Sequence, residues 1–244
     1  MTLRIDVWSD IACPWCFVGK RRLEAAIARL AREPEAPAVE EVWRAFELDP
    51  AAPRERPTDV GYAERLAEKY GSSVKEADGM IARMTEVARA DGLEFRFDRI
   101  RPGNTFDAHR VLHLAAGRGV QDAVKERFLR AYMTEGEPIG DPDALARLAA
   151  EAGLDAEEVR AVLASDAYAA EVRADENDAR TLGINGVPFF VLGEKYAVSG
   201  AQPADLLFRA LTQAATELAA APEPEPDPAN FIWWLSSIQL IGKL

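Results

Sequence analysis

Cys13-Pro14-Trp15-Cys16 contains both cysteines of this 244-residue chain. Two thiols three positions apart on the first turn of a helix can come within bonding distance of each other. The first sulfur then lies at the helix N-terminus, where unpaired N–H groups and the positive end of the helix dipole favour a thiolate. We therefore expect a redox-active dithiol, with the pKa of Cys13 below that of a free thiol.

The residues around this motif predict a strand, a helix and a second strand. Residues 3–8 suit a short strand, and Pro14 fits a first helical turn, where its missing N–H costs nothing. Apolar residues at helical spacing continue to Leu30, and residues 39–48 alternate like a second strand. A CxxC motif where a strand passes into the helix of a βαβ unit is typical of a thioredoxin-like redox fold.

Two structural explanations of the motif are weaker. A zinc site needs four ligands, and His109 and His113 are the only histidines. A permanent disulfide closing so short a loop would restrict the unfolded chain little. The two histidines are four apart and lack a third ligand, so they favour a packed helix over a metal site.

Three more segments extend the pattern beyond residues 8–20: residues 104–110, 186–191 and 196–202. Together the four segments resemble the FrnE branch of the DsbA-like thiol oxidoreductases, from Leu3 to about Leu218. The resemblance implies an α/β thioredoxin fold of βαβ…ββα order, interrupted by a large all-helical insertion. It also implies that Cys13 is the nucleophile and Cys16 the resolving thiol.

The resemblance further implies a cis Val187–Pro188 bond that faces the motif. Val187 would then offer its backbone N–H and C=O to an extended substrate, which docks by strand-like pairing. Pro14 and Trp15 are candidate substrate contacts, although Trp15 equally suits a simple spacer. A functional alternative to the packed helix is that Asn104 and His109 line the groove over Cys13.

The proton acceptor for Cys16 is missing from the pattern. Many thioredoxin-like enzymes bury a carboxylate on the strand six residues before the nucleophile, and here that position is Val7. Asp6 should face the other side of the strand. Glu47 is an outside candidate, and Lys20 is expected on a solvated face.

The chain divides into three parts. Residues 1–56 and 183–220 are expected to form the thioredoxin-like domain, and residues 57–182 the helical insertion, with caps at Ser73, Asp141 and Asp155. Residues 221–244 are expected to be a Pro-rich linker and an apolar C-terminal tail. Residues 221–228 suit an extended spacer, and residues 231–241 a helix that docks on its own chain or on a second copy.

Composition limits the partners and the compartment. There are 29 Lys and Arg against 41 Asp and Glu, so the net charge is −12, which disfavours nucleic acid and anionic membranes. The first ten residues have no apolar signal region, and two thiols in a dithiol motif suit a reducing cytoplasm. No metal or cofactor is expected beyond the redox-active Cys13–Cys16 disulfide, with glutathione as a candidate co-substrate.

Three functions remain open at this point. The first is a thiol–disulfide oxidoreductase or isomerase that acts on protein or small thiols and disulfides. The second is a glutathione-dependent isomerase of the 2-hydroxychromene-2-carboxylate isomerase type, which would not need both cysteines. The third is a non-catalytic holdase that uses the helical insertion.

Overall fold

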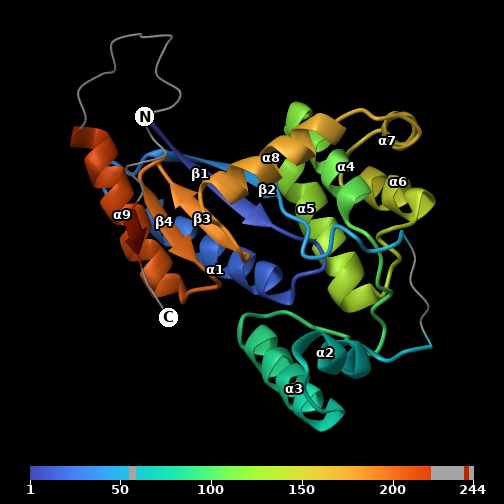
Figure 1. Cartoon of the computed structure of the whole chain (residues 1–244). Coiled ribbons are helices and arrows are strands. Elements are labelled where there is room, and N and C mark those ends of the chain that lie inside the picture. The colour runs from blue at the N-terminus through green and yellow to red at the C-terminus, as the bar shows by residue number, and fades with distance from the viewer. Residues whose placement is uncertain (55–58, 221–238, 242–244) are drawn as a thin grey trace.

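The computed structural model describes residues 1–54, 59–220 and 239–241, and its centre is a mixed β-sheet (Figure 1). The described strands lie in the order β2-β1-β3-β4-β5. β1 is parallel to β2 and antiparallel to β3, β3 is antiparallel to β4, and β4 is parallel to β5. The bounds of the strands are β1 Thr2–Ser9, β2 Ala38–Ala45, β3 Phe189–Leu192, β4 Tyr196–Ser199 and β5 Gln239–Ile241.

Two helices complete the sheet domain: α1 (Pro14–Leu30) joins β1 to β2, and α9 (Ala204–Ala220) follows β4. The order β1-α1-β2 followed by β3-β4-α9 is the predicted thioredoxin fold, and the helices between β2 and β3 are its insertion. They are α2 Tyr62–Tyr70, α3 Val74–Ala90, α4 Phe106–Gly117, α5 Gln121–Arg130, the π-helical turn η1 Ala131–Glu135, α6 Pro142–Glu151, α7 Ala156–Leu163 and α8 Ala169–Thr181.

Several insertion helices begin where the sequence predicts. The side chain of Ser73 accepts a hydrogen bond from the N–H of Glu76, and Glu76 returns one, so the predicted capping box opens α3. Asp141 and Asp155 cap α6 and α7 through their carboxylates. Carboxylate and hydroxyl caps satisfy N–H groups that have no partner inside the helix.

Helix α1 contributes to two of the three hydrophobic clusters of the described residues. Leu23, Ala26 and Leu30 pack with the sheet and α9, whereas Phe17 and Val18 belong to the core of the insertion. Phe17 also stacks on Phe95, with ring centroids 6.0 Å apart. The insertion therefore packs against the N-terminal end of α1, where the two cysteines lie.

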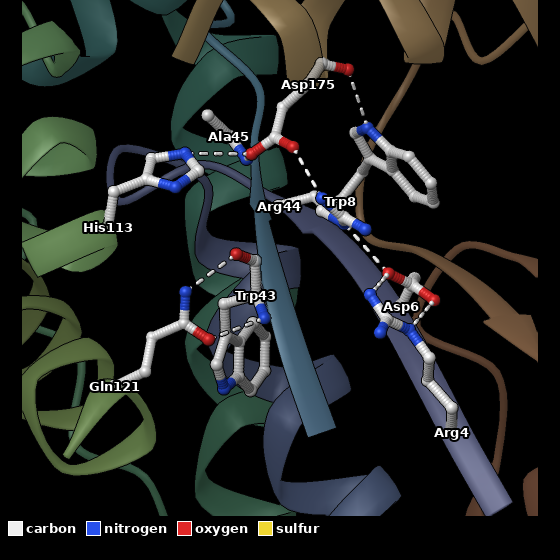
Figure 2. A network of polar contacts seen from close by, with 9 residues as sticks. All are labelled: Arg4, Asp6, Trp8, Trp43, Arg44, Ala45, His113, Gln121 and Asp175. Atoms are coloured by element: carbon white, nitrogen blue, oxygen red, sulfur yellow. Dashed lines mark hydrogen bonds and ion pairs between the residues drawn. The ribbon is translucent and has the colours of Figure 1, made fainter. Parts of the chain in front are cut away.

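The outer edge of β2 is bound to the insertion by side chains (Figure 2). The amide of Gln121 bonds to both the N–H and the C=O of Trp43, each at 2.9 Å. Asp175 accepts from the N–H of Ala45 at 2.8 Å and from Arg44 at 2.9 Å. The insertion thus satisfies backbone groups that an edge strand would otherwise leave unpaired.

The C-terminal tail differs from its prediction where the structure describes it. Residues 239–241 pair with β4 as a parallel strand, so the predicted helix does not extend to them. The free edge of β4 offers backbone donors and acceptors, which a strand can use and a helix cannot. The predicted spacer at 221–228 and residues 231–238 lie outside the described residues.

No helix in the described part of the chain is both long and apolar enough to cross a membrane.

Candidate active site

The two cysteines lie on the first turn of α1, as predicted. Cys13 is the N-cap residue with an extended backbone, and Pro14 occupies the first helical position. The N–H of Cys13 donates to the C=O of Asp10, and the N–H of Cys16 donates to the C=O of Cys13 at 3.1 Å. Both cysteines are free thiols, and Cys16 is fully buried while Cys13 is 4% exposed.

The Val187–Pro188 peptide bond is cis, which confirms the prediction. The thiol of Cys13 donates to the C=O of Val187, with 3.6 Å between sulfur and oxygen. This approach depends on Gly19 of α1, because a Cβ there would lie 2.8 Å from the Cγ of Pro188. The glycine lets α1 and the segment before β3 meet at the motif.

A cavity of about 1040 Å³ opens in front of Cys13. Pro14, Trp15 and Val187 line it on the side of the motif, and Trp15 is 43% exposed. The α2–α3 hairpin supplies the opposite wall, with apolar and basic side chains that include Leu66, Met80, Ile81, Met84, Arg65, Lys69 and Arg83. Cys13 is thus accessible to a substrate in the cavity, whereas Cys16 does not line it.

Asn104 and His109 do not line this cavity. The side chain of Asn104 accepts from the N–H of Phe106 at the start of α4 and donates to Glu47. His109 is 1% exposed, and its Nε2 lies 3.4 Å from the carboxylate of Asp10. The structure therefore places His109 behind the motif, as part of a packed helix.

Asp10 remains an anion behind the dithiol. Burial favours its neutral form, but the nearby imidazole of His109 and a 2.8 Å hydrogen bond from the N–H of Leu48 outweigh burial. The pKa of Asp10 is therefore below its ordinary value. Its negative charge makes ionisation of Cys13 harder, as like charges disfavour each other.

The pKa directions of the two thiols differ from the expectation. Burial opposes ionisation of Cys16, but the hydrogen bond with Cys13, the charge of Lys125 and the hydroxyl of Ser9 lower the pKa of Cys16. The same hydrogen bond, together with burial, raises the pKa of Cys13 well above its ordinary value. The predicted lowering of the pKa of Cys13 is not found, since hydrogen bonding with Cys16 and burial raise it, while Lys125 favours the thiolate of Cys16.

Sequence reasoning missed Lys125, which lies on α5 and is fully buried. Its ammonium donates to the C=O of Ser9 at 3.2 Å and lies 5.5 Å from the centre of the Trp43 ring. Burial lowers the pKa of Lys125 to about 8, although Cys16, Asp10 and Cys13 each act to raise it. In the sequence it resembles an ordinary surface lysine, between Val124 and Glu126, so no local signal identifies it.

Lys20 is buried as well, contrary to the expectation of a solvated face. Its ammonium pairs with Glu24, with Asp122 at 2.9 Å and with Glu126 at 3.5 Å. These carboxylates outweigh burial and raise the pKa of Lys20. The two buried lysines therefore differ in their counter-charges.

Within residues 1–54, 59–220 and 239–241, no cluster of three or more His, Cys, Asp or Glu side chains could hold a metal ion.

Comparison with known proteins gives one family and several relatives. The model of the DSBA-like thioredoxin domain family matches residues 4–212. A probable DsbA oxidoreductase from Streptomyces coelicolor is 47% identical, with a TM-score of 0.82, over 93% of this chain and 94% of that one. The protein YwbO of Bacillus subtilis is 28% identical over 87% of this chain and 97% of its own length.

A more distant structure shares the fold. The cytosolic disulfide reductase DsbM from Pseudomonas aeruginosa, solved with GSH, is 18% identical and has a TM-score of 0.57. The similarity covers 90% of this chain and 98% of that protein.

Proposed function

The chain belongs to the DSBA-like thioredoxin domain family, and on this premise we propose that it is a thiol–disulfide oxidoreductase working through Cys13 and Cys16. The observation that carries the proposal is the asymmetry of the two thiols. Cys13 lines the cavity and contacts the C=O of Val187, whereas Cys16 is sealed behind it. A substrate sulfur in the cavity can reach Cys13 alone.

The reaction takes two exchange steps. The proton that the pair shares moves from Cys13 to Cys16, and the Cys13 thiolate attacks a substrate disulfide to form a mixed disulfide. Cys16 then attacks the sulfur of Cys13, which closes the Cys13–Cys16 disulfide and releases the second substrate thiol. In the oxidised enzyme the same steps run backwards and oxidise a substrate dithiol.

The substrates we propose are protein or small disulfides and thiols, with glutathione as a candidate co-substrate. The wall of the cavity supports this class, since Met80, Ile81 and Met84 offer apolar contacts beside the basic side chains of Arg65 and Lys69. Flexible methionines suit surfaces that accept varied partners. The backbone of Val187 beside Cys13 would pair with an extended peptide.

The four segments of the sequence resemblance support assignment to the FrnE branch. A dithiol motif as the whole cysteine content supports a reducing cytoplasm as the compartment. The net charge of −12 supports partners other than nucleic acid and anionic membranes.

Self-association through the apolar C-terminal tail stays a prediction, to be checked by measuring the molecular mass in dilute solution before and after truncation at Ala221.

The experiment uses Cys13→Ser, Cys16→Ser and the double variant, each treated with a disulfide-bonded peptide and examined by mass spectrometry. Cys16→Ser should accumulate a mixed disulfide at Cys13, Cys13→Ser should form none at Cys16, and the turnover of all three should fall at least a hundredfold. An adduct that forms equally well at Cys16 would refute the roles.

The double variant also separates the alternatives. A glutathione-dependent isomerase would keep its turnover of a 2-hydroxychromene-2-carboxylate substrate without the cysteines. A holdase would keep its ability to suppress the aggregation of an unfolding protein. Either result, together with no disulfide exchange in the wild-type protein, would replace the oxidoreductase.

A further inference from the structure

Lys125 is a buried cation without a carboxylate partner. No carboxylate of residues 1–54 and 59–220 lies within 4.0 Å of its ammonium, whose hydrogen bond goes to the backbone C=O of Ser9. An unpaired buried charge costs several kcal/mol, so such a group is retained where another charge or a proton transfer compensates for it. The nearby groups that can supply a compensating charge or take part in a proton transfer are the thiols of Cys13 and Cys16.

The groups facing Lys125 come from three elements. Cys16 and Lys20 lie on α1, Cys13 and Asp10 lie in the turn that precedes it, and Trp43 presents its ring from β2. Among the groups that raise the pKa of Lys125, Cys16 has the largest effect, ahead of Asp10 and Cys13. Lys20 acts in the opposite direction, but its own charge is balanced by three carboxylates.

We propose that Lys125 is the proton carrier of the dithiol, accepting the proton of Cys16 when Cys16 attacks the mixed disulfide and returning it when the disulfide is reduced. This role rests on the proposed oxidoreductase function. It assigns a proton acceptor to Cys16, because Val7 occupies the strand position where many thioredoxin-like enzymes bury a carboxylate. Glu47, the candidate from the sequence, is bound to Asn104 and Arg173 instead.

Protons and electrons balance when a substrate disulfide is reduced. In the mixed disulfide neither Cys13 nor Cys16 carries a negative charge, so Lys125 loses its proton to water, and the S–H proton of Cys16 then passes to the neutral amine. The Cys16 thiolate forms a bond to the sulfur of Cys13, and the bond from Cys13 to the substrate sulfur breaks. The substrate leaves as a thiolate and takes a proton from water in the cavity. The dithiol has lost two electrons, and the substrate disulfide has gained them.

Oxidation also removes the charge that holds the proton on Lys125. Next to a neutral disulfide, the ammonium keeps the cost of burial but loses the attraction of the thiolates. Its affinity for the proton falls, which favours return of the proton to Cys16 when the disulfide is reduced. Lys125 therefore stabilises the reduced protein more than the oxidised one, and the thiol–disulfide equilibrium depends on it.

The test compares full-length Lys125→Met with the control Lys20→Met, because both lysines are buried and lie near the Trp43 ring. The readouts are the thiolate absorbance at 240 nm against pH, the equilibrium with a glutathione redox buffer at pH 7, and the rates of formation and resolution of the mixed disulfide. Glutathione disulfide is the probe.

For Lys125→Met we expect thiolate formation at a pH at least one unit higher and an equilibrium shifted at least tenfold toward the disulfide. A tenfold shift is about 30 mV for two electrons. Resolution should slow at least tenfold, while formation of the mixed disulfide at Cys13, compared at equal thiolate fraction, changes less than threefold. Lys20→Met should alter each value less than threefold.

Equal shifts in the two variants would overturn the proposal. It would also be overturned if the glutathione equilibrium constant and the thiolate ionisation constant of Lys125→Met both lie within threefold of the wild-type values. If Lys125→Met does not fold, the wild-type protein still tests it, since its resolution rate should rise with pH through one ionisation at or below about pH 8. Lys125→Arg should lose that ionisation because arginine keeps its proton. A wild-type protein that forms no mixed disulfide would instead refute the oxidoreductase function itself.

Discussion

Gly19 provides a sharp test of how the motif is held against Pro188. A Cβ added at this position would lie 2.8 Å from the Cγ and 3.4 Å from the Cβ of Pro188, and 3.3 Å from the Cζ of Phe190. The proline ring cannot rotate away, and Phe190 is fully buried in the core of the sheet. Gly19→Ala therefore has to push α1 away from Pro188.

Two opposing effects set the size of the change. Alanine is favoured over glycine inside a helix by about 1 kcal/mol. Overpacking a dense core costs about 1–3 kcal/mol, and a contact of 2.8 Å to a rigid ring belongs in the upper part of this range. We expect Gly19→Ala to lower the free energy of unfolding by about 1–2 kcal/mol, which is a fall in Tm of roughly 2–8 °C.

The control is Gly79→Ala in the interior of α3, where the nearest atom to an added Cβ is the flexible end of Arg83 at 3.5 Å. Without a clash, this change should raise the free energy of unfolding by about 0.5–1 kcal/mol. Urea unfolding and thermal unfolding of both variants measure the difference. If Gly19→Ala is stabilising to the same degree as Gly79→Ala, the close packing of α1 on Pro188 is refuted.

Asp175→Ala should lower the free energy of unfolding in urea by about 3 kcal/mol. It leaves the N–H of Ala45 without its acceptor and removes one of the two carboxylates, Asp6 and Asp175, that pair with Arg44. A loss no larger than that of the exposed Asp178→Ala would contradict this. Burial raises the pKa of Glu41 from 4.5 to about 7. The folded state therefore binds its proton more tightly, and stability falls as the pH rises from 4.5 to 7. Glu41→Gln should remove that fall and stabilise the protein by about 1–3 kcal/mol at pH 8, and an unchanged stability profile against pH would count against it.

The sequence by itself determined the fold and the positions of the reactive thiols. Cys13 and Cys16 mark the junction of β1 and α1, and the caps at Ser73 and Asp141 mark helix starts, because each of these features depends on residues within one turn of each other. The cis bond before Pro188 followed from the resemblance to a known family. Local chemistry sufficed for the thiols and the helix starts, whereas the cis bond needed that resemblance.

Only the tertiary structure decided the electrostatics of the site. Lys125 is 109 positions from Cys16 in the chain, and its burial depends on how α5 packs against β1 and β2. A lysine on a helix looks the same in a sequence whether its ammonium is solvated or buried, so neither Lys125 nor the burial of Lys20 could be foreseen. The effect of Lys125 on the pKa of Cys16 could not be foreseen for the same reason, since a charge acts through space and the sequence does not contain the distance.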